Sequence, residues 1–219
     1  MDPESRDAFL VSEMTECARK AGALWLNHDT TGNVSVRCDA GMSISCSGSS
    51  CATLADIHMV LVTPFGLEGP ENLRPSSEYP FHHAIYEARP DVHAIIHCHS
   101  YAATVVATDG VNLPIDFHYM ALALKADVRD GIRCAPFEIP GSDALATATV
   151  QALGGANACL LGNHGQVAVG RTPRGALSNA IILEELCRYY IASYPLRSPK
   201  RIPADKLEAL IALFPHYRG

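Results

Sequence analysis

The chain has 219 residues, of which 48% are hydrophobic and 18% charged, so one domain spanning residues 1–219 is predicted, because a single core serves up to about 250 residues. The net charge of −6 argues against a broad basic face, and we expect no nucleic-acid partner. No apolar run approaches the ~18 residues typical of a membrane span, and the first residues lack a secretion pattern, which predicts a cytoplasmic protein without a membrane partner.

The first third of the chain predicts a helix followed by short strands. Apolar residues recur at helical spacing between Glu4 and Leu26, which predicts a helix ending near Gly22, with Trp25 packed in the core at its end. Strand-like runs follow at residues 32–38, 42–46 and 58–63, separated by Asp, Gly and Ser. We therefore expect a sheet to form early in the chain.

The rest of the chain alternates helices with further strands. A helix is predicted from Pro75 to about Arg89, because Ser76 and Ser77 can cap it and Glu78 falls in its first turn. Further strands are predicted at residues 93–99, 132–137, 158–161 and 166–170, and further helices at 100–107, 142–153, 172–193 and 204–214. This mixture predicts an α/β fold in which helices pack around one sheet.

The eight cysteines are predicted to be reduced and buried. None belongs to a Cys-x-x-Cys pair, and most lie inside apolar runs, where free cysteine behaves as a small hydrophobic residue. Cys98 stands between two histidines, but on a strand its side chain points away from both, so it is interpreted as a wall residue.

The motif His97-Cys98-His99 suggests a metal site. Residues two apart on a strand project to the same face, so His97 and His99 point together, and neutral imidazole nitrogen suits zinc. Chance is the competing interpretation, because ten histidines in 219 residues will sometimes fall two apart.

His164 offers a third ligand from a separate part of the chain. It lies in the turn Gly162-Asn163-His164-Gly165, directly after a buried run, and the glycines permit the backbone geometry that would bring its imidazole to the strand ends. A lone histidine in a turn is more often a surface residue. Three ligands with an open fourth position are, however, what a catalytic zinc requires.

Glu78 has a structural and a functional interpretation. In the structural one, an acid in the first turn of a helix is simply favoured by the helix dipole. In the functional one, the same turn offers two serine hydroxyls and free backbone N–H groups to an anion, with a carboxylate beside them. Gly32-Asn33 and Ser47-Gly48 could add donors to one phosphate pocket, although Gly-Ser loops are common.

Four motifs together resemble the class II aldolase/adducin family. They are Thr-Gly-Asn-Val-Ser-Val-Arg at 31–37, Pro-Ser-Ser-Glu at 75–78, His-Cys-His-Ser at 97–100, and Asn-His-Gly at 163–165 followed by Val-Ala-Val-Gly at 167–170. They occur in the family's order and spacing over nearly the whole chain, and most resemble its L-fuculose-1-phosphate aldolase branch. The resemblance implies a three-layer α/β/α subunit with a mainly antiparallel central sheet, in a cyclic homotetramer with active sites between neighbours.

The resemblance also implies residue roles. By position, His97, His99 and His164 look like the ligands of Zn²⁺, with Mn²⁺, Co²⁺ or Fe²⁺ as alternatives. Glu78 looks like the acid/base, and it can also touch the metal when no substrate is bound. Tyr119 and Tyr217 match two tyrosines of these aldolases, of which the first assists at the aldehyde oxygen. The residues that match the phosphate pocket are Asn33, Ser47, Gly48, Ser76 and Ser77.

The implied activity is cleavage of a small ketose 1-phosphate, of the fuculose-1-phosphate type, into dihydroxyacetone phosphate and an aldehyde. Two departures border the expected substrate pocket: Ser-Cys-Ser-Gly at 45–48 replaces Thr-Pro-Thr-Gly, and Tyr-Pro-Phe at 79–81 replaces a bulky aromatic and a basic residue. A decarboxylase, a dehydratase or a 4-epimerase of a related sugar phosphate on the same metal site therefore stays open. A non-catalytic adducin-like module is disfavoured, because such heads lack an intact ligand set.

Overall fold

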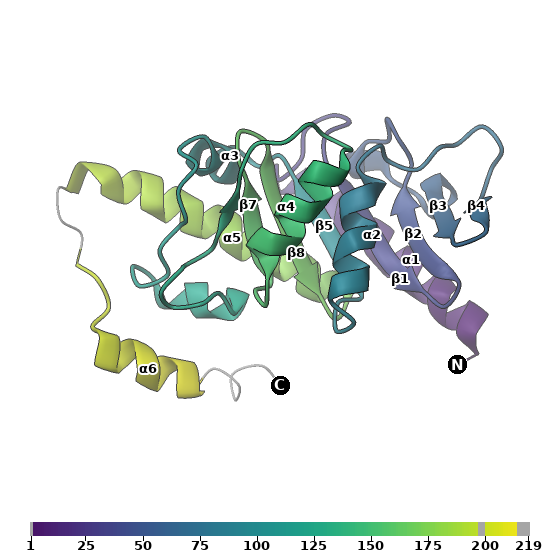
Figure 1. Cartoon of the computed structure of the whole chain (residues 1–219). Coiled ribbons are helices and arrows are strands. Elements are labelled where there is room, and N and C mark those ends of the chain that lie inside the picture. Colours follow the sequence, from purple (N-terminus) through teal and green to yellow (C-terminus); the bar gives the residue numbers. More distant parts are fainter. Residues whose placement is uncertain (1, 197–199, 214–219) are drawn as a thin grey trace.

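The computed structural model describes residues 2–196 and 200–213, and one eight-stranded sheet forms its centre (Figure 1). The strands are β1 (Asn33–Cys38), β2 (Gly41–Ser45), β3 (Met59–Thr63), β4 (Gly66–Glu68), β5 (Ala94–Cys98), β6 (Cys134–Ala135), β7 (Ala158–Leu161) and β8 (Gly165–Gly170). Their order in the sheet is β4-β3-β2-β1-β5-β8-β7-β6. Only the β6–β7 pair is parallel, so the expectation of a mainly antiparallel sheet is confirmed.

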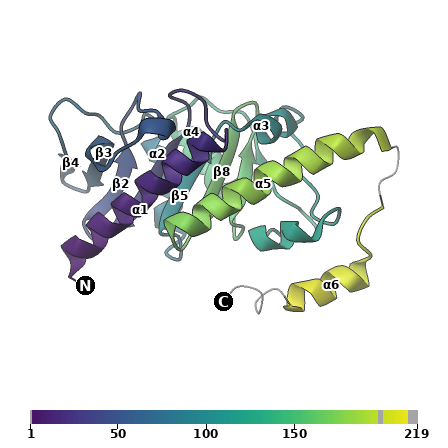
Figure 2. The same ribbon diagram turned by 180° about the vertical axis from the view of Figure 1, so that it is seen from behind.

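Helices cover both faces of the sheet and make three layers. One face carries α1 (Pro3–Ala23), α3 (Tyr101–Ala107) and α5 (Pro173–Ser193), and the other carries α2 (Tyr79–Ala88) and α4 (Asp143–Leu153) (Figures 1 and 2). A last helix, α6 (Ala204–Leu213), inserts Leu207 into the core on the α5 side. The predicted three-layer α/β/α fold is therefore confirmed.

Alternation along the strands separates two hydrophobic cores. On β5, Ala94, Ile96 and Cys98 pack on the α1, α3 and α5 side, while Ile95 packs with the side chains of α2 and α4. His97 follows the same alternation, and the edge of its ring meets Phe81 of α2 with ring centroids 5.5 Å apart. The first ligand candidate thus faces the α2 layer.

The end of α1 differs from the prediction for Trp25. The N–H of Trp25 donates to the carbonyl of Gly22 and that of Leu26 to the carbonyl of Ala21, with Trp25 in the left-handed region at φ 59°. This is the paired hydrogen-bond arrangement that closes many helices, although glycine usually occupies the left-handed position. The expectation of core packing is wrong, because this turn leaves the indole 70% exposed.

Two other predicted elements are shorter than expected. The helix predicted from Pro75 begins at Tyr79, and Glu78 occupies the N-cap position without a side-chain cap, because Pro75 pairs with Cys46 in a β-bridge and stays extended. Of the strand predicted at 132–137 only β6 forms, since Ile132 pairs with Leu113 instead and Pro136 has no N–H to donate. Glu78 therefore precedes the first helical turn.

Among residues 2–196 and 200–213, no helix has the length and apolar character that crossing a membrane requires.

Candidate active site

Three imidazoles converge beside the end of β5. His97 lies on β5, His99 directly follows it, and His164 lies in the turn between β7 and β8. The ring centroids of each of the three pairs are 4.8 Å apart, and the Nε2 atoms of His97 and His99 are 2.9 Å apart. The fold thus brings together the three histidines singled out in the sequence.

Asn27 holds the backbone between the first two histidines. Its side-chain amide donates to the carbonyl of His97 at 3.2 Å, and its Oδ1 accepts from the N–H of His99 at 2.9 Å. Gly165 packs against the same stretch, where a Cβ would collide with the Cys98 carbonyl. Sequence reasoning missed Asn27, because nothing local to it indicates a partner 70 residues away.

The hydrogen bonds and burial of the rings leave nitrogen lone pairs facing one another. Nδ1 of His97 lies 2.9 Å from the carbonyl of Gln166, so it carries the proton and leaves Nε2 free to bind a cation. Burial, together with the neighbouring imidazoles, lowers the pKa of His99 to about 3 and that of His164 to about 4. Both rings are therefore neutral near pH 7, the form that ligates metals.

Glu78 completes the group. Its Oε2 lies 3.2 Å from Nε2 of His97 and its Oε1 lies 3.3 Å from Nε2 of His164, while Asn33 donates to Oε2 at 2.9 Å. Burial by itself would raise the pKa of Glu78, but attraction to His97 and His164 and the hydrogen bonds outweigh it and hold that pKa well below its usual range. The carboxyl group is thus ionised.

This group fits a divalent cation. The donor atoms of Glu78, His97, His99 and His164 all lie within 4.8 Å of one another, and nitrogens about 2.0–2.1 Å from a tetrahedral zinc lie roughly 3.3 Å apart. Glu78 Oε1 is buried without a hydrogen-bond donor, which is costly unless a cation compensates it. Three imidazoles beside an ionised carboxylate are a donor set suited to zinc and its first-row neighbours.

The phosphate-pocket candidates lie on two adjoining segments. The N–H of Ser47 donates to the carbonyl of Arg74 and that of Ser76 to the carbonyl of Ser45, so these segments run side by side. Ser47, Gly48 and Ser77 are exposed, whereas the buried Ser76 accepts from the N–H of Glu78 at 3.3 Å. Asn33 approaches the site from β1, where it pairs in register with His97.

Of the two tyrosines, only Tyr119 is described, and it stands apart from this group in the subunit. Tyr119 begins the short helix η3 (Tyr119–Leu124), is 51% exposed, and stacks on His118. In both views η3, the short teal helix near α6, lies on the opposite side of α5 from α3, which begins two residues after His99 (Figures 1 and 2). Tyr217 falls outside the described residues.

His82 is a buried neighbour of this group that the sequence did not single out. Its Nε2 lies 2.6 Å from Oδ1 of Asn33, and its Nδ1 lies 2.7 Å from Oγ of Ser35. Ser35 in turn contacts the hydroxyl of Tyr86 at 2.9 Å. The four-residue spacing of His82 and Tyr86, which puts both on one helix face, is the only local signal of this chain of contacts.

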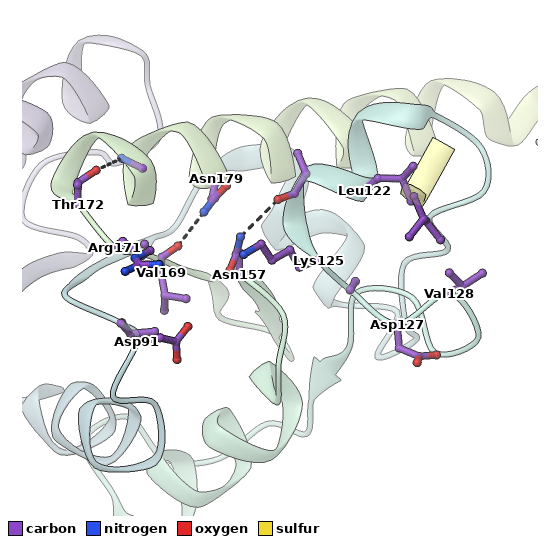
Figure 3. Close-up of a pocket in the computed structure, with 16 residues that line it drawn as sticks. Asp91, Leu122, Lys125, Asp127, Val128, Asn157, Val169, Arg171, Thr172 and Asn179 are labelled. Carbon is purple, nitrogen blue, oxygen red and sulfur yellow. Dashed lines mark hydrogen bonds between the residues drawn. The ribbon is translucent and has the colours of Figure 1, made fainter. Parts of the chain in front are cut away.

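A large cavity of 970 Å³ lies at the other end of β5 and β8 (Figure 3). Asp91, which precedes β5, and Gly170, which ends β8, help to line it, whereas His97 and Gly165 lie at the opposite ends of these antiparallel strands. Several of its polar groups already serve the fold: Thr172 caps α5 and Asn179 donates to the carbonyl of Val169. The converging ligand atoms are at the other end, in the histidine group.

Comparison with known proteins identifies the family of this chain. The family model described as Class II Aldolase and Adducin N-terminal domain matches residues 12–191. The chain is 38% identical to a 5-methylthioribulose-1-phosphate/5-deoxyribulose-1-phosphate aldolase of Rhodospirillum rubrum, over 98% of this chain and 95% of that protein. It is 32% identical to the L-fuculose phosphate aldolase of Escherichia coli K12, over 92% of each.

A solved structure agrees with these sequence matches. An L-fuculose 1-phosphate aldolase superposes with a TM-score of 0.85 at 28% identity, over 94% of this chain and 95% of that chain. The chain therefore belongs to the class II aldolase and adducin family, and it lies close to L-fuculose-1-phosphate aldolase within it.

Proposed function

We propose that the chain is a metal-dependent aldolase that cleaves a ketose 1-phosphate into dihydroxyacetone phosphate and an aldehyde. The observation that carries this proposal is the convergence of Glu78, His97, His99 and His164 on one point. The names of two relatives support it, because both denote aldolases that act on phosphorylated sugars. An adducin-like module without catalysis would have no use for this donor set.

His97, His99 and His164 are the proposed ligands of a divalent ion. Zn²⁺ is our first candidate because of the three imidazoles, and Mn²⁺, Co²⁺ and Fe²⁺ suit the same nitrogens. When bound, the ion would act as a Lewis acid that stabilises the negative charge developing on substrate oxygen as the carbon–carbon bond breaks. The hydrogen bond from Nδ1 of His97 to Gln166 keeps the ligating nitrogen of that ring unprotonated.

Glu78 is the proposed acid/base. Cleavage leaves a carbanion-like carbon on the phosphate-bearing fragment, and this carbon must gain a proton; in the synthetic direction it must lose one. The Glu78 carboxylate is ionised and lies 3.2 and 3.3 Å from the ligand nitrogens, so it lies next to any substrate oxygen held among them. In the synthetic direction the ionised carboxylate accepts the proton from this carbon; in cleavage it takes a proton from solvent and passes it to the carbon, as general acid–base catalysis requires.

The substrate phosphate is proposed to bind beside Glu78. Ser47, Gly48, Ser76 and Ser77 lie on the two segments joined by the Ser47 and Ser76 backbone hydrogen bonds, and they offer hydroxyls and backbone N–H groups to an anion. One N–H of the Asn33 amide donates to Glu78. The amide nitrogen carries a second N–H, which can donate to a phosphate oxygen.

We also propose that the active enzyme is a homotetramer in which a neighbour completes each site. The short helix η3, which begins with Tyr119, packs against α5 and lies on the opposite side of that helix from α3 (Figure 2), so we infer that Tyr119 meets substrate at another subunit's histidines. Its half-exposed ring is available for such a contact. There it would donate to and accept from the oxygen of the departing aldehyde. Tyr217 is proposed as a second tyrosine at the same substrate.

A retro-aldol assay tests this function. Zinc-loaded protein is offered the 1-phosphates of fuculose, rhamnulose, 5-deoxyribulose and 5-methylthioribulose, and dihydroxyacetone phosphate is measured. We expect release from at least one ketose, its loss with a chelator, and its return with Zn²⁺. Protein that holds metal but releases nothing from any of them would contradict the proposal and favour decarboxylation, dehydration or 4-epimerisation on the same scaffold.

A further inference from the structure

Behind Glu78 runs a buried chain of five polar side chains that links α2 to β1. Asn33 Nδ2 donates to Glu78 at 2.9 Å, Asn33 Oδ1 lies 2.6 Å from His82 Nε2, and His82 Nδ1 lies 2.7 Å from Ser35 Oγ. Tyr86 ends the chain, with its hydroxyl 2.9 Å from Ser35 Oγ. All five side chains are buried, so each contact has been kept away from water.

The secondary structure explains why these side chains meet. His82 and Tyr86 are four residues apart on α2 and therefore share one face of that helix. Asn33 and Ser35 are two residues apart on β1 and therefore share one face of that strand. When α2 packs on the sheet, the two pairs face each other and form a continuous chain ending at Glu78.

Only one assignment of protons satisfies the whole chain. An ionised Glu78 only accepts, so Asn33 must present its NH₂ group to Glu78 and its carbonyl oxygen to His82. His82 must then donate from Nε2 and accept at Nδ1. Ser35 consequently donates to Nδ1, and its oxygen accepts the proton of Tyr86. Burial lowers the pKa of His82 to about 3, in agreement with the neutral ring that this assignment requires.

We propose that His82 is a positioning residue that acts on Glu78 through Asn33, keeping the Asn33 carboxamide from turning over. A carboxamide rotated by half a turn would present its oxygen to the Glu78 carboxylate, and the two acceptors would repel each other. The N–H of His82 opposes this rotation because it needs an acceptor in the same place. The inference rests on the proposed function in that it takes Glu78 as the group that transfers the proton.

Loss of the His82 hydrogen bond should slow the chemical step of the reaction. Losing an outer hydrogen-bonding partner of a metal or catalytic residue typically costs roughly 10–100-fold in activity, and small displacements of a reacting group cost similar factors. A misoriented Glu78 would slow proton transfer while the three histidines still bound the ion. We therefore expect a lower kcat with metal content and KM nearly unchanged.

The test compares His82→Leu, which removes the donor, with His82→Gln, which supplies an amide N–H in a similar place. Each protein is assayed for kcat, KM, zinc content and Tm, and His83→Gln on the exposed side of α2 is the matched control. We expect His82→Leu to lower kcat about 10–100-fold, His82→Gln to restore most of it, and His83→Gln to change nothing. Equal kcat values for wild type and a folded, zinc-loaded His82→Leu would overturn the proposal.

A spectroscopic readout separates this inference from the proposed function. In protein with ¹⁵N-labelled histidine, the signal that disappears in His82→Gln should be that of a neutral ring protonated at Nε2. A ring protonated at Nδ1, or at both nitrogens, would overturn the proposal whatever the enzyme's substrate. If His82→Leu fails to fold, Ser35→Ala replaces it. That variant should lower kcat and shift the His82 signal towards the other tautomer, and unchanged values of both would contradict the inference.

Discussion

Nε2 of His97 lies 3.2 Å from Oε2 of Glu78, so a proposed metal ligand and the proposed acid/base adjoin each other. The fold produces this contact from two layers. His97 projects from β5 towards α2, and Glu78 precedes the first turn of α2. Because one carboxylate contacts both His97 and His164, only a substitution can separate its proposed proton transfer from an effect on metal binding.

Removal of a ligand should release the metal. We expect His99→Ala to lower zinc affinity and activity by more than roughly 10–100-fold, the loss that is typical when a residue hydrogen-bonded to a metal ligand is removed. Metal per subunit, measured by mass spectrometry after dialysis, checks this, with the exposed His28→Ala as control. Full occupancy in His99→Ala would exclude His99 from the ligand set.

Neutralising the carboxylate should separate metal binding from chemistry. Glu78→Gln keeps the shape of the side chain and an oxygen that can accept from Asn33, but it cannot take up the substrate proton. We expect zinc content to persist while kcat falls by about 10²–10⁴-fold, the usual contribution of general acid–base catalysis. A zinc-loaded Glu78→Gln variant with wild-type turnover would show that the acid/base lies elsewhere.

Acid should destabilise the metal-free protein before it affects most carboxylates. Burial is the main cause that lowers the pKa of His82, His99 and His164 to about 3, 3 and 4, from 6.5. Between about pH 6.5 and pH 4 the unfolded chain therefore binds more protons than the folded one, and stability falls as the pH falls. Above that window these rings contribute no pH dependence.

Thermal unfolding of chelator-treated protein at pH 7.5, 6.0 and 5.0 measures this effect. We expect Tm to decrease as the pH falls. A fully buried ring such as His82 lowers the free energy of unfolding by at most about 1.4 kcal/mol for each pH unit. His82→Gln should make the slope shallower, because one such ring is gone. A Tm that stays constant from pH 7.5 to 5.0 would contradict the neutral, buried state of these histidines.

Mixed oligomers can show whether a neighbour supplies Tyr119. We expect Tyr119→Phe and Glu78→Gln to be impaired as separate proteins. Co-expressed, they should form tetramers in which about a quarter of the sites combine both native residues, because each site draws the two residues from different subunits. Activity that rises towards a quarter of the wild-type value supports a shared site. Mixed tetramers that are no more active than either variant alone would refute it.

The sequence could single out the three histidines that converge, but not the residues that hold them in place. The two-residue spacing in His97-Cys98-His99 and the glycine-bounded turn at His164 are local patterns, and both are brought to one point. Asn27 and His82 act through contacts with residues 47 to 72 positions away, and no local pattern identifies such partners.

The fold shows the same division between local and long-range information. Ser142 and Thr172 cap α4 and α5 as their residue types predict. The start of α2 was misplaced because the Cys46–Pro75 bridge, a contact between distant segments, keeps Pro75 extended, and a turn at Ser77 and Glu78 precedes the helix. Strand β4 was missed because its three residues are all exposed and show no apolar alternation. Strand order depends on such long-range pairing, and only the family resemblance indicated that the sheet is mainly antiparallel.

The most direct test of a catalytic metal at Glu78, His97, His99 and His164 is a titration of metal-stripped protein with Zn²⁺, in which dihydroxyacetone phosphate release is followed at each addition. The account predicts no release from the stripped protein and a linear rise that saturates at one ion per subunit, with no rise for His97→Ala. Release by protein from which all metal has been removed would contradict it, as would an equal rise in His97→Ala.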